Sequence, residues 1–273
     1  MQNHLRLHHD DSRTSLKSLF GRSIEKLLVE QLDVGCGVGH WGRILAPFLS
    51  THCHVVGVDR ETTWVKQATL NAQQQGLSQT YRYQQADAQC LPFEEHCFDA
   101  VTCQTLLIHV AKPEQVLDEM CRVLSPGGIL IAVEPNNLAR NLVLGNMRFD
   151  WSTDEILALT KFQMLCEQGK INLGLGDNSL GDNLPAYFSA AGLTNISTYL
   201  SDKAFSYQPP YHSPTETNLI AEAKKRLEQA FWIWSKAALA MRFQKKIADN
   251  IDSNSYVNAG GNICYLVSGI KAF

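Results

Sequence analysis

The chain has 273 residues and a formal net charge of -3; 45% of its residues are hydrophobic and 19% are charged. This composition is sufficient for a globular core and excludes a disordered or strongly basic protein. Because the chain has no overall positive field, we expect no nucleic acid among its partners.

The cysteines and the start of the chain bear on where the protein works. The chain has eight cysteines and no CxxC pair, and several of the cysteines fall inside hydrophobic runs, so we interpret them as free thiols. The polar, histidine-rich residues 1–10 lack the apolar region of a secretory signal. No apolar stretch is long enough for a membrane span, and no metal-ligand spacing stands out. We therefore predict a cytoplasmic protein without a metal.

Strand-like and helix-like patterns alternate up to residue 135. Strand-like patterns predict five strands, at 32–34, 55–58, 81–85, 98–102 and 129–133. Helical spacing of apolar residues predicts helices at 41–49, 62–75 and 113–124, and Ser-Pro-Gly-Gly at 125–128 predicts a turn. Such alternation predicts a parallel sheet with helices on both faces.

Beyond residue 135 the pattern becomes mostly helical. Ser152 and Glu155 have the spacing of a capping box, which predicts a helix running towards Gly169. Further helices are predicted at 182–192 and, as one long amphipathic helix or a helix pair, at 215–250. Apolar runs at 196–200 and 263–270 predict a sixth and a seventh strand.

These elements predict an α/β fold with a doubly wound, seven-stranded, mostly parallel sheet. We expect a single domain over residues 1–273, with a cofactor-binding core at 27–135. Helical insertions are expected after strand 5, at 136–185, and between strands 6 and 7, at 208–258. The apolar and amide side chains of the first insertion suit a lid, and the insertions together are expected to form a lid or an interface.

The strongest functional signal is the glycine-rich loop at 35–39, Gly-Cys-Gly-Val-Gly. Glycines let the backbone approach a cofactor closely, and the helix that follows presents free N–H groups. In one register the glycines at 37, 39 and 42 match a dinucleotide-binding pattern, but Asp33 and Gly35 then fall in the buried strand, which they suit poorly. In the other register Asp33 precedes the loop, where an acid can counter the charge of a cationic ligand.

Four further segments accompany the loop in a fixed order. They are Val-Asp at 58–59, Ala-Asp-Ala with Leu-Pro-Phe at 86–93, Cys-Phe-Asp-Ala-Val at 97–101 and Arg-Val-Leu-Ser-Pro-Gly-Gly at 122–128. Together with Leu-Asp-Val-Gly-Cys-Gly-Val-Gly at 32–39, they resemble the class I, Rossmann-like S-adenosylmethionine-dependent methyltransferases. The small-molecule branches, including quinone- and sterol-type enzymes, are the most similar in this core.

The resemblance implies roles for the matched residues and for their neighbours. Gly35, Cys36, Gly37 and Gly39 would shape the cofactor loop. Asp33 would lie near the methionine portion of S-adenosylmethionine, whose product after transfer is S-adenosylhomocysteine.

The resemblance also implies contacts for residues that follow the later strands. Asp59 would hold the two ribose hydroxyls and Arg60 would line the adenine side. Asp87 would accept a hydrogen bond from the adenine amino group, with Ala88 donating through its backbone. Gln104 would face the methionine end. Asp59 as an ordinary surface acid and Asp87 as an Asx turn are the structural alternatives.

The methyl acceptor is less defined by the sequence. DNA and RNA amino-methyltransferases often carry an Asn/Asp-Pro-Pro-aromatic motif after the fourth strand, where this chain has Gln104-Thr105-Leu106-Leu107. A small, neutral, partly apolar acceptor is therefore favoured. His109, beside the expected reaction site, is either a general base or a residue that holds its loop through a backbone hydrogen bond.

Other functions stay open at this stage. A protein or RNA methyltransferase could use the helix at 215–250, with its basic residues, as a docking surface. The glycine loop would also suit an NAD-dependent enzyme or a cofactor-binding module without activity. The same helix could form a homodimer.

Overall fold

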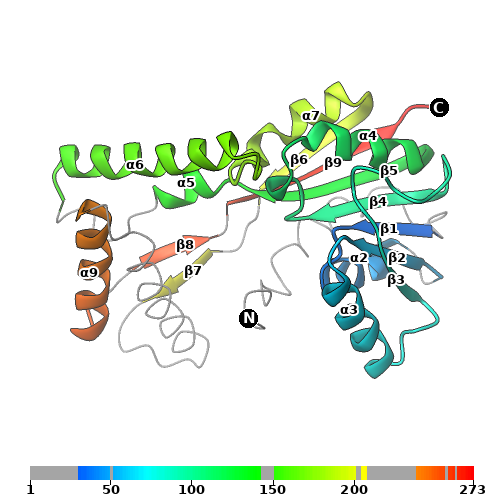
Figure 1. Cartoon of the computed structure of the whole chain (residues 1–273), viewed down its shortest axis with the longest axis horizontal. Coiled ribbons are helices and arrows are strands. Elements are labelled where there is room, and N and C mark those ends of the chain that lie inside the picture. Colours follow the sequence, from blue (N-terminus) through cyan, green and yellow to red (C-terminus); the bar gives the residue numbers. More distant parts are fainter. Residues whose placement is uncertain are drawn as a thin grey trace. The chain divides into compact units, whose positions relative to one another are not determined.

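The computed structural model in Figure 1 describes residues 30–49, 52–142, 151–200, 204–207, 238–255, 258–261 and 263–273. The chain divides into two compact units. The first consists of Met1–Asn137, Lys170–Lys203 and Ile263–Phe273, and the second consists of Leu138–Gly169 and Ala204–Asn262. The first unit contains the large sheet and all of the predicted site residues.

The sheet of the first unit has seven strands in the order β3-β2-β1-β4-β5-β9-β6. Their bounds are Glu30–Val34 (β1), His54–Asp59 (β2), Tyr81–Gln85 (β3), Phe98–Gln104 (β4), Leu124–Pro135 (β5), Leu193–Leu200 (β6) and Cys264–Lys271 (β9). β1 to β5 pair in parallel, whereas β9 runs antiparallel to both β5 and β6. The predicted seven-stranded, mostly parallel sheet is confirmed.

Helices cover both faces of this sheet (Figure 1). One face carries α2 (His40–Leu49) and α3 (Thr62–Gln74), and the other carries α4 (Pro113–Val123) and α7 (Leu184–Ala190). Two short 3-10 helices, η1 (Leu107–His109) and η3 (Leu180–Asn183), lie in the connections.

Strand side chains alternate between the two cores. Along β5, Leu130 and Ala132 pack in the cluster that includes α4 and α7. Ile129, Ile131 and Val133 pack in the cluster that includes residues of α2 and Ala72 of α3. Burial on both faces explains why the central strands have near-continuous apolar runs, as expected for a parallel sheet.

The second unit contains α9 (Ala238–Asp252), most of α5 (Asn137–Asn141) and most of α6 (Thr153–Asn172). The predicted capping box is confirmed at the start of α6: Glu155 N donates to Ser152 Oγ at 3.3 Å, and Ser152 N donates to Glu155 Oε2 at 2.9 Å. A two-stranded antiparallel sheet of β7 (Ala204–Tyr207) and β8 (Asn258–Gly261) was not predicted.

The second insertion and the fifth strand differ from the sequence-based expectation. Of the helix predicted at 215–250, residues up to 237 lie outside the described part, and α9 covers the remainder. β5 begins at Leu124 because Leu124 already pairs with Phe98 of β4. The next pair along the two strands is Ala100 with Ile129, so the register shifts between these two pairs. The predicted turn at 125–128 is therefore an irregularity within the strand, where Gly127 has a φ of 77°.

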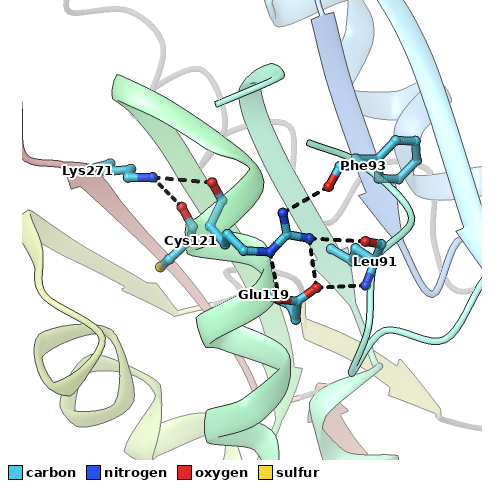
Figure 2. Close-up of polar contacts among 6 residues, drawn as sticks. Leu91, Phe93, Glu119, Cys121 and Lys271 are labelled. Atoms are coloured by element: carbon cyan, nitrogen blue, oxygen red, sulfur yellow. Dashed lines mark hydrogen bonds and ion pairs between the residues drawn. The ribbon is translucent and has the colours of Figure 1, made fainter. Parts of the chain in front are cut away.

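Arg122, in the last turn of α4, fastens the loop that follows β3 (Figure 2). Its guanidinium donates to the carbonyl oxygens of Leu91 at 3.0 Å and Phe93 at 2.8 Å. It also donates to both carboxylate oxygens of Glu119, at 2.7 and 2.9 Å. Glu119 Oε2 in turn accepts a hydrogen bond from Leu91 N at 2.7 Å. Two of the matched sequence segments, far apart in the chain, are thus joined by one planar side chain.

Lys271 fixes the end of the same helix from the last strand. Its ammonium donates to the carbonyl oxygens of Cys121 at 2.6 Å and Leu124 at 2.7 Å (Figure 2 shows the contact with Cys121). A positive charge at the C-terminal end of a helix satisfies carbonyl groups that have no partner within the helix.

We expect Arg122→Met to lower the free energy of unfolding of the first unit by about 2–4 kcal/mol, because two carbonyl groups and one carboxylate lose their donor. Lys66→Met, on the exposed side of α3 in the same unit, is the matched control and should change it by less than about 0.5 kcal/mol. Thermal and urea unfolding measure both variants. Equal stability of the two would contradict the fastening role of Arg122.

Candidate functional site

A cavity of about 460 Å³ lies where β1, β2 and β4 end in the first unit. Ligands of doubly wound folds bind at this edge, beyond the carboxyl ends of the strands. The lining includes every predicted site residue except Asp33 and Gly39, namely Gly35, Cys36, Gly37, Asp59, Arg60, Asp87, Ala88, Gln104 and His109.

The glycines of the loop are required by conformation and by close packing. Gly35, Gly37 and Gly39 have φ angles of 69°, 51° and 74°, in the region that side chains disfavour. A Cβ on Gly35 would lie 2.8 Å from a methyl group of Leu106, and one on Gly39 would overlap the hydroxyl of Tyr83. At Gly37, no atom of a non-adjacent described residue lies within 4 Å of such a Cβ, so the backbone there faces open space.

Asp33 lies outside the cavity lining and is fully enclosed by protein. Its Oδ2 accepts a hydrogen bond from Gly42 N, in the first turn of α2, at 3.0 Å. Burial raises the pKa of Asp33 to about 7, although that hydrogen bond acts in the opposite direction. The structure therefore shows Asp33 fixing the helix that follows the loop. Its nearness to the methionine portion of the cofactor stays a prediction.

Asp59 joins the end of β2 to the glycine loop. Its Oδ2 accepts a hydrogen bond from Gly37 N at 2.9 Å, and its Oδ1 accepts one from Glu61 N at 2.9 Å. Each carboxylate oxygen can accept more than one hydrogen bond, so acceptor capacity remains for a ligand in the cavity. Arg60 is exposed beside it, with its Nε 3.5 Å from Glu61 Oε1.

Asp87 forms an Asx turn, which was the structural alternative to its predicted adenine contact. Its Oδ1 accepts a hydrogen bond from Gln89 N at 2.9 Å, and its carbonyl oxygen accepts one from Cys90 N at 3.1 Å. Asp87 and Ala88 nevertheless both line the cavity. The turn fixes the backbone here and leaves the exposed carboxylate at the cavity wall, so the structural and the binding interpretations are compatible.

The chain leaves β4 through a strained residue. Gln104 is the last residue of the strand, and Thr105 after it has a φ of 54°, which is uncommon for a β-branched residue. Thr105 N donates to Val133 O of β5 at 2.9 Å, which holds this conformation. Strained backbone concentrates at functional sites, and Gln104 and Thr105 both line the cavity.

Glu134, on β5, lies outside the cavity lining but holds the turn after β4, and the sequence analysis did not single it out. Its carboxylate is completely buried, and Oε1 accepts hydrogen bonds from Leu106 N and Leu107 N, both at 2.8 Å. Oε2 accepts a longer hydrogen bond from Ile108 N, at 3.4 Å. Burial raises the pKa of Glu134 to about 7. The sequence did contain a signal for this role, because Glu134 is an acid at the end of an apolar run. A carboxylate buried there requires several hydrogen-bond donors.

His109 follows these residues and lines the cavity. Burial lowers the pKa of its ring, and the positive charges of Lys170 and Arg60 lower the pKa further. The ring is therefore neutral at pH 7 and can accept a proton. The backbone N–H of His109 donates to Leu106 O at 2.9 Å, but its ring makes no hydrogen bond within the described part of the chain.

Two tryptophans complete the wall and were also missed as site residues. Trp64, near the start of α3, is 36% exposed and lines the cavity. Trp41, in the first turn of α2, lines it while almost fully buried, and its Nε1 has no hydrogen-bond partner among the described residues. The sequence signal for both tryptophans was their position, because each follows shortly after a predicted binding segment, the glycine loop for Trp41 and Asp59-Arg60 for Trp64.

The described residues contain neither a cluster of metal-ligand side chains nor a helix that could span a membrane. Within these ranges no three or more His, Cys, Asp or Glu side chains are grouped so that they could hold a metal ion. In the same part of the chain no helix is both long and apolar enough to cross a membrane.

Comparison with known sequences bears on the same segment of the chain. Residues 32–132 match a family model described as a methyltransferase domain. A ubiquinone biosynthesis O-methyltransferase of Maricaulis maris is 28% identical over 184 residues, which cover 67% of this chain and 71% of that protein. A sterol 24-C-methyltransferase of Gibberella zeae is 40% identical over 98 residues, which cover 36% of this chain but only 25% of that protein.

Solved structures agree on the fold. A putative methyltransferase of Bacillus halodurans matches with a TM-score of 0.58 and 20% identity, over 95% of this chain and 100% of that one. A phosphoethanolamine N-methyltransferase of Haemonchus contortus, solved with S-adenosyl-L-methionine, matches with a TM-score of 0.51 and 17% identity, over 96% of this chain and 52% of that one.

The matched segment contains the glycine loop, Asp59, Asp87 and the end of β4, which are the parts that form the cavity. S-adenosylmethionine is the cofactor of such methyltransferases, and the open backbone at Gly37 and the Asp59 carboxylate make the cavity compatible with it. Residues 32–132 therefore match a methyltransferase domain, and the fold is that of the class I S-adenosylmethionine-dependent methyltransferases.

Proposed function

We propose that the enzyme transfers a methyl group from S-adenosylmethionine to a small, partly apolar acceptor by in-line displacement. The observation that carries this proposal is the composition of one cavity. Its wall combines the predicted cofactor residues with His109 and with apolar side chains such as Leu106 and Val110. A cofactor and a small acceptor could therefore meet in the same cavity.

The proposed cofactor contacts follow from the ends of the strands. Asp59 accepts hydrogen bonds from the ribose hydroxyls, since a carboxylate with spare acceptor capacity suits a vicinal diol. Arg60 lines the adenine side, and Asp87 and Ala88 contact the adenine edge. Gln104 faces the methionine end. Their positions on the wall of one cavity support this assignment.

The proposed chemistry requires little from the protein beyond alignment. When bound, S-adenosylmethionine supplies a methyl group on a positively charged sulfur. The surrounding residues hold the acceptor in line with it and exclude water. His109 accepts the proton that the acceptor loses, at a ring nitrogen that is neutral at pH 7.

The size and polarity of the acceptor are supported by the relatives. Their names include ubiquinone and sterol methyltransferases, which act on small molecules. The alternative is a protein or RNA methyltransferase that docks its substrate on the C-terminal insertion, through Lys224-Lys225-Arg226 and through Arg242 with Lys245 and Lys246. In α9, Lys245 Nζ forms an ion pair with Asp249 Oδ2 at 3.0 Å on the exposed helix surface. We favour the small acceptor because the named relatives act on small molecules.

The insertions at 136–185 and 208–258 stay a predicted lid or interface. Residues 143–150 and 208–237 lie outside the described part. Hydrogen exchange with and without S-adenosylhomocysteine would test the lid, and light scattering would test a homodimer.

Asp59→Ala should weaken the binding of S-adenosylhomocysteine by about 1.5–3 kcal/mol, because hydrogen bonds to a charged carboxylate are lost. Titration calorimetry measures the affinity, and a melting curve verifies that the loop bonded to Asp59 has not collapsed. Asp118→Ala, on the exposed side of α4, is the matched control and should bind normally. Unchanged affinity in Asp59→Ala would remove the ribose assignment.

His109→Gln should lower kcat by ~10²-fold or more if the ring is the general base, while S-adenosylhomocysteine affinity and melting temperature stay unchanged. The control is His54→Gln, an exposed position at the opposite end of β2, which should keep full activity. If the ring is structural instead, stability or cofactor binding should fall together with activity. Full activity in His109→Gln would leave alignment as the only catalytic device.

A further inference from the structure

The backbone turn from Leu106 to His109 is held from two sides by opposite charges. Its first N–H groups donate to the buried Glu134 carboxylate, as described above. At the other end of the turn, the carbonyl oxygen of Ile108 accepts a hydrogen bond from Lys170 Nζ at 2.8 Å. Lys170 is in the last turn of α6, in the part that belongs to the first unit.

The signs of these charges match the polarity of the turn. An anion faces the N–H end and a cation faces the carbonyl end, which is the arrangement that stabilises a helical turn. A buried carboxylate is costly unless it is well supplied with donors, and all three hydrogen bonds that Glu134 accepts in the described part come from this turn. Burial of the Glu134 carboxylate therefore serves to fix the turn.

The segment that follows Lys170 packs against the same turn. A Cβ on Gly176, which has a φ of 87°, would overlap Ile108 O. A Cβ on Gly181 would overlap the carbonyl oxygen of Glu134. Lys170 Nζ also donates to Asn178 Oδ1. Lys170 and Gly176 thus contact the backbone beside His109, and Gly181 contacts β5 at Glu134.

We propose that Glu134 and Lys170 are positioning residues that hold His109 at the acceptor side of the cavity, one from each end of the turn. This inference rests on the proposed function, because the position of His109 matters only if its ring acts on the methyl acceptor. Neither residue needs to touch the cofactor or the acceptor. Both act through the backbone of Leu106–Ile108.

The placement of Lys170 has an electrostatic consequence for His109. The charged groups that act on the ring are Lys170 on α6 and Arg60 after β2. Lys112 and Glu114, both exposed, follow His109 closely in the sequence, and the buried Glu134 faces Lys170. Lys170 disfavours a second positive charge nearby. Removing its charge should therefore make the ring easier to protonate and raise the pKa of His109.

The test uses the full chain and two variants of Lys170. In Lys170→Met, the NMR titration midpoint of the His109 ring should rise by about 0.5–1 pH unit, whereas Lys170→Arg, which keeps the charge, should leave it within about 0.2. Lys66→Met is the control for loss of a distant lysine charge and should have no effect. The His109 signal is assigned by its loss in His109→Gln. An unchanged midpoint in Lys170→Met would overturn the role of Lys170.

Glu134→Gln tests the other end of the turn. The amide places an N–H₂ group against backbone donors, so exchange of the Leu106–Ile108 amide protons should accelerate by ~10-fold or more relative to those of α3. An equal change at the turn and in α3 would mean general destabilisation and would overturn the role of Glu134. Both readouts are independent of methyl transfer. If His109→Gln keeps full activity, the general-base proposal fails, and the positioning of the ring is still decided by these measurements.

Discussion

Carboxylates that accept backbone N–H groups organise this enzyme's cavity. Loops at the carboxyl ends of parallel strands present donors that no sheet partner satisfies. Here Asp33 binds the start of α2, Asp59 binds the glycine loop and Glu134 binds the turn after β4. Each acid lies in or directly after a strand, where the sheet fixes its position. The loops around the proposed ligand are therefore attached to the most rigid part of the fold.

The remainder of the first unit supports this edge of the sheet. Two apolar clusters hold helices on opposite faces, so the strands that carry the acids are buried on both sides. Arg122, a cation, also holds a loop, since it donates hydrogen bonds to the carbonyl groups of the loop after β3. The matched segments of the sequence are thus parts of a single framework: some line the cavity, and others hold the lining in place.

Local patterns in the sequence were sufficient for most of this framework. Strands β1 to β5 follow from strand-like sequence patterns, and the start of α6 follows from Ser152 and Glu155, because both signals act over a few residues. The role of Glu134 could not be predicted, since its partners at 106–108 are distant in the sequence and only the sheet brings them together. The β7–β8 pair was missed for the same reason, and the irregularity in β5 appears only through its pairing with β4.

The central claim is that this cavity is the binding site for S-adenosylmethionine. The most direct measurement is a crystal structure of the full chain grown with S-adenosylhomocysteine. We predict that the ligand occupies the cavity, with its ribose hydroxyls on the Asp59 carboxylate and its sulfur towards Gln104 and His109. Ligand bound elsewhere on the chain, or in the cavity without contact to Asp59, would contradict this account.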